Sequence, residues 1–303
     1  MNFIHVPVLF DEVLASFDNE PSVFVDLTSG GGGHDAGILE KYPNVRAVLI
    51  DRDPDAVAHL REKFASFPKV TVVNAPFSEI DKVMFLMQIP KVDIVFADLG
   101  VSSFQFDTPQ RGFSMQKDGP MDMRMDKSSS VTALDFIKNS TEGELRNILS
   151  LYAQEREAGA VARTLKKCAE DGMTTTLEFA EKIRKVKRYG KKGIDPATQV
   201  FMALRMAVND ELGELERVLK KAFPLLSDKG ILGIITFHST EDRIVKNFFR
   251  DRKNRVPFYV DSNDAVPFCS DTSLSAEMIT PTDEECSRNP RARSAKLRIL
   301  KKV

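Results

Sequence analysis

The sequence predicts a mixed α/β protein in which a helical segment interrupts a parallel sheet. Three observations lead to this prediction. Short apolar, strand-like runs alternate with helical patterns up to residue 98, helical patterns alone continue to about residue 226, and a strand-like run returns at residues 231–237. A chain of 303 residues has room for two domains of ordinary size. We therefore expect a sheet domain over residues 1–106 and 205–303, with an inserted helical domain over residues 107–204.

The composition is that of a globular protein. Hydrophobic residues make up 42% of the chain and charged residues 29%. No apolar run reaches the roughly 20 residues of a membrane span, and the N-terminal residues lack the pattern of a signal peptide. Three scattered cysteines, and histidines without metal-ligand spacing, predict neither a disulfide framework nor a metal site. We expect a cytoplasmic protein without a metal, in which a net charge of −1 leaves nucleic-acid binding to a local basic patch.

The individual elements follow from the spacing of apolar residues. Short apolar runs predict strands at residues 23–27, 47–50, 70–73, 92–97, 231–237 and 295–300, the last at the edge of the sheet. Helical spacing predicts helices near residues 8–17, 36–39, 55–64, 79–87 and through 131–226. Asp195-Pro196 is a typical helix start, because it joins a capping residue to a proline in the first turn. Residues 107–126 and 262–282 lack periodicity and are expected to form loops.

A glycine turn, Gly30-Gly31-Gly32-Gly33, follows the first predicted strand. Asp51 ends the second strand 21 residues after Gly30, the arrangement in which nucleotide-binding α/β folds hold a ribose. The dinucleotide fingerprint needs a third glycine at position 35, which is Asp35, and we expect its carboxylate to repel a pyrophosphate. S-adenosylmethionine has no phosphate, and Asp26, Gly30 and Gly32 fit the acid-and-glycine turn of class I methyltransferases, with Thr28 where that pattern usually has glycine. The alternative is a plain tight turn.

Polar residues close several predicted strands, where ligands of open α/β sheets bind. Asp98 is followed by Ser102 and Ser103, and an acid with two hydroxyls suits an exocyclic amine as substrate. We take Asp98, Ser102 and His238 as candidate catalytic residues. The alternative for the run from His238 to Asp242 is that Ser239 and Asp242 cap the next helix. Phe77, after the third strand, either packs on adenine or belongs to the core.

Three basic clusters favour a polyanionic partner, the alternative being solvated faces. The first comprises Lys182, Arg184, Lys185, Lys187, Arg188, Lys191 and Lys192. The second comprises Arg243, Lys246, Arg250, Arg252, Lys253 and Arg255. The third comprises Arg288, Arg291, Arg293, Lys296, Arg298, Lys301 and Lys302. Met121, Met123 and Met125 either cover a bound base or fill a gap.

Several motifs, in order along nearly the whole chain, resemble one family. They are His5-Val6-Pro7-Val8-Leu9, Gly30-Gly31-Gly32-Gly33-His34, Asp51-Arg52-Asp53-Pro54, Asp98-Leu99-Gly100-Val101-Ser102-Ser103, Arg111-Gly112-Phe113-Ser114, the run from Asp118 to Asp126, Pro196-Ala197-Thr198, Phe237-His238-Ser239 and Asn289-Pro290-Arg291-Ala292-Arg293-Ser294. The family is ribosomal RNA small subunit methyltransferase H, the bacterial cytosine-N4 methyltransferases of 16S rRNA.

The resemblance implies a class I, Rossmann-like methyltransferase sheet with an inserted helical domain for substrate recognition. It implies S-adenosylmethionine as methyl donor and, as acceptor, a decoding-centre cytosine of 16S rRNA within the small subunit. The cofactor contacts that it implies are Gly32, Gly33, His34, Asp51, Phe77, Asp98 and Gln105.

Four residues depart from those usual in the family, namely Leu27, Ser29, Asp35 and Gln199. They motivate an alternative function, a non-catalytic RNA-binding or ribosome-assembly factor on a methyltransferase fold. A further alternative is a methyltransferase that acts on another substrate, such as a protein amine.

Overall fold

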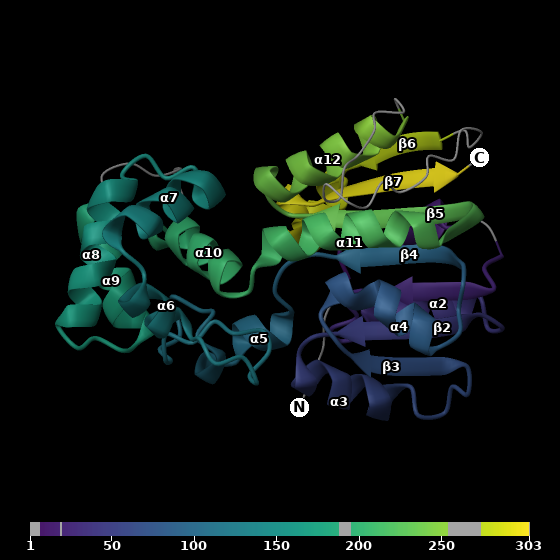
Figure 1. Ribbon diagram of the computed structural model, residues 1–303, viewed down its shortest axis with the longest axis horizontal. Helices are drawn as coiled ribbons and strands as arrows, with labels where there is room; N and C mark the ends of the chain where they lie inside the picture. Colours follow the sequence, from purple (N-terminus) through teal and green to yellow (C-terminus); the bar gives the residue numbers. More distant parts are fainter. Residues whose placement is uncertain (1–6, 19, 188–194, 254–273, 303) are drawn as a thin grey trace. The chain divides into compact units, whose positions relative to one another are not determined.

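The computed structural model describes residues 7–18, 20–187, 195–253 and 274–302 (Figure 1). It contains two compact units. The sheet unit comprises Met1–Gly100 and Leu212–Val303, and the helical unit comprises Val101–Glu211. The sequence prediction placed the divisions after residues 106 and 204. Within the described ranges, every helix falls short of the length and apolar character that a bilayer span requires.

The sheet unit is built on seven strands in the order β3-β2-β1-β4-β5-β7-β6. The first five in this order run parallel, whereas β7 lies antiparallel between β5 and β6. The chain reverses its direction of strand addition between β1 and β4, which is the switch point where doubly wound sheets bind ligands. The strands are β1 (Val23–Asp26), β2 (Arg46–Asp51), β3 (Val70–Asn74), β4 (Val92–Asp98), β5 (Leu226–Thr236), β6 (Leu274–Ile279) and β7 (Lys296–Lys302).

Helices cover both faces of this sheet, because its central strands are apolar on both sides. Val25, Val48 and Val95 pack in a cluster with α4, α11 and α12. Phe24 and Phe96, on the opposite face, pack with α1, α2 and α3. The elements that complete the unit are α1 (Phe10–Ser16), α2 (Gly33–Lys41), α3 (Pro54–Lys63), η1 (Phe77–Glu79), α4 (Ile80–Leu86), α11 (Glu211–Leu225), α12 (Ser239–Lys253), α13 (Asp283–Arg288) and η3 (Pro290–Ser294).

Two sequence predictions about the end of the chain were wrong. The strand expected at the edge, β7, is an interior strand, and the edge is β6, which forms at Leu274–Ile279 in a stretch expected as a loop. Residues 275–278 are all exposed, so β6 has no buried face to show as apolar alternation. The rest of that expected loop, up to residue 273, lies outside the described residues. β5 also begins five residues before the predicted strand, at Leu226.

The helical unit has its own core, in which Leu149, Val161, Leu165 and Phe179 are fully buried. Threonine capping boxes at Thr132, Thr141 and Thr175 start three of its helices. Its elements are α5 (Ser103–Asp107), η2 (Pro109–Arg111), α6 (Ala133–Asn139), α7 (Glu142–Ala153), α8 (Ala158–Glu170), α9 (Thr176–Val186) and α10 (Ala197–Val208).

At the start of α10, Asp195 Oδ1 accepts from the Ala197 N–H at 2.9 Å. The N-cap position of α10 is Pro196, one residue after the predicted cap at Asp195, but the Asp195 carboxylate does bind the first turn of the helix. The same carboxylate also accepts hydrogen bonds from Arg184.

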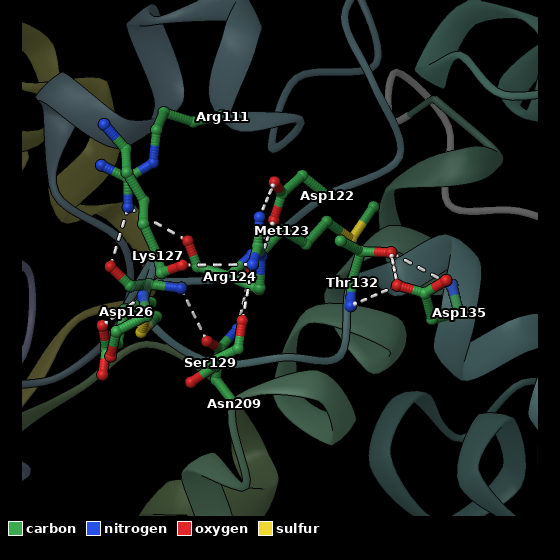
Figure 2. Close-up of polar contacts among 12 residues, drawn as sticks. Arg111, Asp122, Met123, Arg124, Asp126, Lys127, Ser129, Thr132, Asp135 and Asn209 are labelled. Atoms are coloured by element: carbon green, nitrogen blue, oxygen red, sulfur yellow. Dashed lines mark hydrogen bonds and ion pairs between the residues drawn. The ribbon is translucent and has the colours of Figure 1, made fainter.

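A loop of irregular backbone precedes α6 and is held by side chains that bind its peptide groups (Figure 2). Asn209 accepts from Met125 N at 2.8 Å and donates to Met123 O at 2.7 Å, and Arg111 donates to Met125 O at 2.8 Å. Asn209 and Arg111 are both buried. Met121, Met123 and Met125 are buried in the core of the helical unit, which favours the gap-filling interpretation of these methionines.

We expect Asn209→Ala to destabilise the helical unit by about 2–4 kcal/mol, because it leaves a buried peptide N–H and a buried carbonyl unpaired. Urea unfolding of the full chain measures the effect. Asn139→Ala, at the exposed end of α6, is the matched control and should unfold as the wild type does. Equal unfolding curves for the two variants would contradict the assigned role of Asn209.

Candidate active site

The glycine turn links β1 to α2 in a backbone conformation that depends on glycine. Gly30 and Gly32 have φ of 52° and 68°, and Gly32 is the N-cap of α2. A Cβ on Gly32 would lie 2.7 Å from the Phe64 ring. Lys63 Nζ donates to Gly31 O at 2.8 Å and to Gly32 O at 2.7 Å. The turn is therefore packed and hydrogen-bonded from the side of α3.

Asp51, at the end of β2, holds this turn from the other side. Its Oδ2 accepts from Gly30 N and its Oδ1 from Asp53 N, each at 2.8 Å. Burial raises the pKa of Asp51 to about 6, against the effect of these two N–H groups. Each carboxylate oxygen keeps a further lone pair, so Asp51 can still accept hydrogen bonds from a ligand's hydroxyl groups.

Asp26 and Asp35 form a buried carboxyl pair beneath the turn. Burial raises the pKa of Asp26 to about 7. Burial and the neighbouring Asp26 charge raise the pKa of Asp35 well above its ordinary value. Both shifts favour the protonated form of the pair. The sequence argument that the Asp35 carboxylate repels a pyrophosphate stays a prediction, and the full burial of Asp35 together with its raised pKa weakens it.

Asp98, at the end of β4, presents an acceptor without a protein partner. Its Oδ1 is buried and has no hydrogen-bond partner among the described residues. Its Oδ2 lies 3.9 Å from His34 Nδ1, and His34 Nε2 lies 3.0 Å from Val8 O. Burial, with the charges of Asp26 and Glu241, raises the pKa of Asp98 well above its ordinary value. A buried oxygen of this kind calls for a donor, which a ligand can supply.

Thr28 joins the ends of β1 and β4, a contact that the sequence did not predict. Its hydroxyl oxygen accepts from Asp98 N at 2.7 Å. Position 28 usually holds glycine in the acid-and-glycine turn, so this departure from the pattern was the only signal.

His238 lies at the start of α12 and is held by the first turn of that helix. Its Nε2 lies 2.8 Å from Glu241 Oε1, and its Nδ1 accepts from Glu241 N at 3.4 Å. Glu241 is itself buried and accepts from Phe237 N at 3.1 Å. These contacts hold His238 against the first turn of α12, and its catalytic role stays a prediction. The carboxylate of Asp242, one of the two residues expected to cap this helix, accepts hydrogen bonds from Lys296 and Arg298.

The remaining predicted site residues lie in local hydrogen-bond or packing networks. Ser102 and Gln105, in the helical unit, form the capping box of α5, in which Ser102 Oγ accepts from Gln105 N at 3.2 Å.

Phe77, in η1 of the sheet unit, packs against the core at the face of α4 and α11. The next residue, Ser78, donates its N–H and its hydroxyl to the Glu214 carboxylate at 3.2 and 2.9 Å. Glu214 thereby fixes the turn that carries Phe77. Gly33 begins α2, where a Cβ would lie 2.6 Å from Pro7.

The electrostatics of the strand ends favour a cationic ligand. Asp26, Asp51 and Asp98 all have raised pKa values, and the mutual repulsion of carboxylates contributes to each. A bound cation would relieve this repulsion and favour the ionised forms. Within the ranges that the structure describes, no group of three or more His, Cys, Asp or Glu side chains is arranged to hold a metal ion.

The structure divides the second and third basic clusters into paired and exposed residues. Asp242 accepts from Lys296 at 2.9 Å and from Arg298 at 2.6 Å, so these two cations serve the fold. Arg252 lies over the rings of Phe223 and Phe248. The basic residues exposed on α12 and near η3 are Arg243, Lys246, Arg250, Lys253, Arg288, Arg291 and Arg293. Arg255 of the second cluster and His5, Val6 and Cys269 lie outside the described residues.

A family model described as the MraW methylase family matches residues 2–303. The chain belongs to this family. Membership confirms the predicted enzyme class, a methyltransferase, and with the seven-stranded α/β sheet it confirms the predicted class I, Rossmann-like fold. The MraW-family match covers both the sheet unit and the helical unit.

Relatives of this MraW-family chain cover nearly its whole length. Ribosomal RNA small subunit methyltransferase H of Methylobacterium nodulans is 43% identical over 97% of this chain and 89% of that protein. The protein of the same name from Caldicellulosiruptor saccharolyticus is 40% identical over 99% of both. A solved rRNA methylase from Streptococcus thermophilus covers 99% of this chain and 98% of its own at 10% identity, with a TM-score of 0.43, too low to support an argument.

We expect Asp35→Asn to raise the stability of this protein at pH 8 and to flatten its dependence on pH. The folded carboxyl pair binds protons that the unfolded chain, with an ordinary pKa of 3.8, has lost. The contribution of this carboxyl pair to the free energy of unfolding therefore falls as the pH rises from about 4 through about 7. Melting temperatures between pH 5 and 8 measure this. Asp228→Asn, on an exposed residue of β5, is the control, and a slope in Asp35→Asn equal to that of the wild type would refute the assignment.

Proposed function

We propose that this methyltransferase transfers a methyl group from S-adenosylmethionine to the N4 amine of a cytosine in the decoding centre of 16S rRNA. The observation that carries the proposal is the buried, unpartnered Oδ1 of Asp98 at the switch-point edge of the sheet. The names of the relatives support an rRNA of the small subunit as substrate. The helical unit would recognise the RNA, and a cytoplasmic location follows from that substrate.

The residues of the sheet unit fit the proposed cofactor. Asp51 offers acceptors for the two ribose hydroxyls, at the end of the strand next to the glycine turn. The carboxylates of Asp51 and Asp98 provide a negative environment for a molecule that carries a sulfonium and an ammonium group. Gly32, Gly33 and His34 form the start of α2, and Phe77 provides a flat apolar surface for adenine. Gln105 stays a predicted contact of the helical unit.

The chemistry required of the protein is modest. When bound, S-adenosylmethionine supplies an electrophilic methyl carbon on a positively charged sulfur. The exocyclic amine of cytosine is a weak nucleophile, because its lone pair is delocalised into the ring. Asp98 Oδ1 would accept an N–H of this amine and orient its lone pair toward the methyl carbon. The same oxygen, whose pKa is raised by burial, would receive the proton that the nitrogen releases. Ser102 and His238 are secondary candidates for positioning the base, which must leave its stack to reach the methyl carbon.

We expect Asp98→Asn to lower kcat by about 100-fold, because an amide neither carries the charge nor takes the proton. The assay combines purified protein, methyl-labelled S-adenosylmethionine and small subunits that lack the modification, and the methylated nucleoside is identified by mass spectrometry. Asp228→Asn is the matched control and should be fully active. Label on another position or on a protein would overturn the cytosine-N4 assignment, and wild-type activity in Asp98→Asn would exclude the role of Asp98.

We expect the affinity for S-adenosylmethionine to fall as the pH is lowered through about 6, because protonation of Asp51 removes its charge and one acceptor. Asp51→Asn should weaken binding by about 10- to 100-fold, the value of a hydrogen bond to a charged group. Calorimetry between pH 5.5 and 8 measures both effects. No binding to the wild type at any pH would favour the alternative of a non-catalytic RNA-binding factor.

A further inference from the structure

The basic residues near the end of α9 do not form one continuous surface. Arg184 donates to Asp195 Oδ2 from Nη2 at 2.6 Å and from Nε at 3.0 Å. Lys187 Nζ is buried and lies 2.5 Å from Glu155 Oε2. Both cations are therefore engaged within the helical unit. Arg188, Lys191 and Lys192 lie outside the described residues.

Lys182 and Lys185 behave differently, because they line a cavity between α8 and α9. The cavity has a volume of about 210 Å³, and Lys167 of α8 lines it as well. The side chains of these three lysines make no ion pair or hydrogen bond to another described residue. Figure 1 shows α8 and α9 side by side in the helical unit. Three lysines from two helices thus line one hollow.

The side chains that line this cavity carry more positive than negative charge. Asp171 is the one carboxylate in the lining, so the described lining has a net charge of +2 at neutral pH. Lys182 and Asp171 are close enough to the buried Cys168 thiol to affect its pKa. Burial raises the pKa of Cys168, while Lys182 lowers it and Asp171 raises it. Helix C-termini attract cations, which accounts for Lys167 and Lys185 in their last turns, but Lys182 is outside the last turn of α9.

The size and the donors of the cavity define the ligand. Its volume exceeds the roughly 30 Å³ of a water molecule several-fold but lies below the roughly 300 Å³ at which pockets for whole small molecules begin. The Thr164 hydroxyl in the lining donates to Ala160 O at 2.9 Å, so the free donors are the three ammonium groups. Such a site suits a tetrahedral anion that is part of a larger molecule.

We propose that Lys167, Lys182 and Lys185 form a phosphate subsite that binds one backbone phosphate of the RNA substrate. The inference rests on the proposed function in that the substrate is an RNA. The contact is to the backbone, so it positions the RNA on the helical unit and adds affinity without reading sequence. The cavity is distinct from the strand ends of the sheet unit, where the methyl group is transferred.

The test compares two triple variants with the same loss of charge in the helical unit. Lys167→Gln/Lys182→Gln/Lys185→Gln removes the subsite. Lys138→Gln/Arg146→Gln/Arg163→Gln removes three exposed charges that do not line the cavity. Affinity for 16S rRNA is measured by filter binding between 50 and 200 mM salt. Relative to the control, the subsite variant should bind RNA about tenfold more weakly at low salt. The plot of the logarithm of its association constant against log salt should also be less steep by about 0.7–0.9, which corresponds to the loss of one phosphate contact.

Further readouts separate this role from a structural one. The subsite variant should keep the wild-type affinity for S-adenosylmethionine and the wild-type kcat at saturating RNA, with KM for RNA raised about tenfold. If the triple variant does not fold, Lys182→Gln alone should show the same pattern at smaller amplitude. Equal RNA affinity and salt slope in the two triple variants would overturn the proposal.

A free phosphate compound is the other source of the same chemistry. Calorimetry with inorganic phosphate tests it. Phosphate binding that is lost in the subsite variant, with RNA affinity unchanged, would overturn the RNA assignment. Failure of the proposed function looks different, because the wild type would then methylate no RNA. If the wild type methylates RNA and the subsite variant binds it as the control does, this inference alone fails.

Discussion

The site depends on the concentration of carboxyl groups at the carboxyl ends of adjacent parallel strands. Asp26, Asp51 and Asp98 end β1, β2 and β4, and the register of the sheet brings these ends to one edge. Burial and the charges of neighbouring carboxylates raise the pKa of each group and so disfavour its ionised form. The backbone N–H groups of Thr28 and Gly30, which bind Asp26 and Asp51, act in the opposite direction. The fold thus stores an electrostatic preference that a cationic ligand satisfies.

In the proposed function, the sheet unit would hold the cofactor and the helical unit would bind the RNA. The sheet unit supplies the carboxylates and the turn, and its geometry follows from strand register and from glycine conformations. The helical unit supplies rigid surfaces, because Asn209 and Arg111 hold an irregular loop by its peptide groups. Its lysines are of two kinds, some neutralised within the fold and others exposed around a hollow. The number of basic residues in the sequence is therefore larger than the number that is exposed and could contact an RNA.

Much of the sheet unit could be predicted, because its central strands are apolar on both faces and each ends in a polar residue. The glycine turn and Asp51 could be predicted because they directly follow and end such strands, at a spacing typical of nucleotide-binding folds. Edge strand β6 could not be predicted, since its exposed residues show no alternation. Side-chain contacts between residues far apart in the sequence could not be predicted either. The contact of Thr28 with Asp98, the link from Glu214 to Ser78 and the pairing of Lys187 with Glu155 depend on topology and rotamers rather than on local pattern.

The position of β7 bears on how the chain assembles during synthesis. β5 pairs with β4 on one side but finds its second neighbour in residues 296–301, which follow it in the sequence. The helical unit, in contrast, is one continuous stretch of local helices. On a translating ribosome the helices can therefore compact early, while β5 lacks a partner on one side until β7 has emerged. Loss of β7 would leave that side of β5 open to other chains.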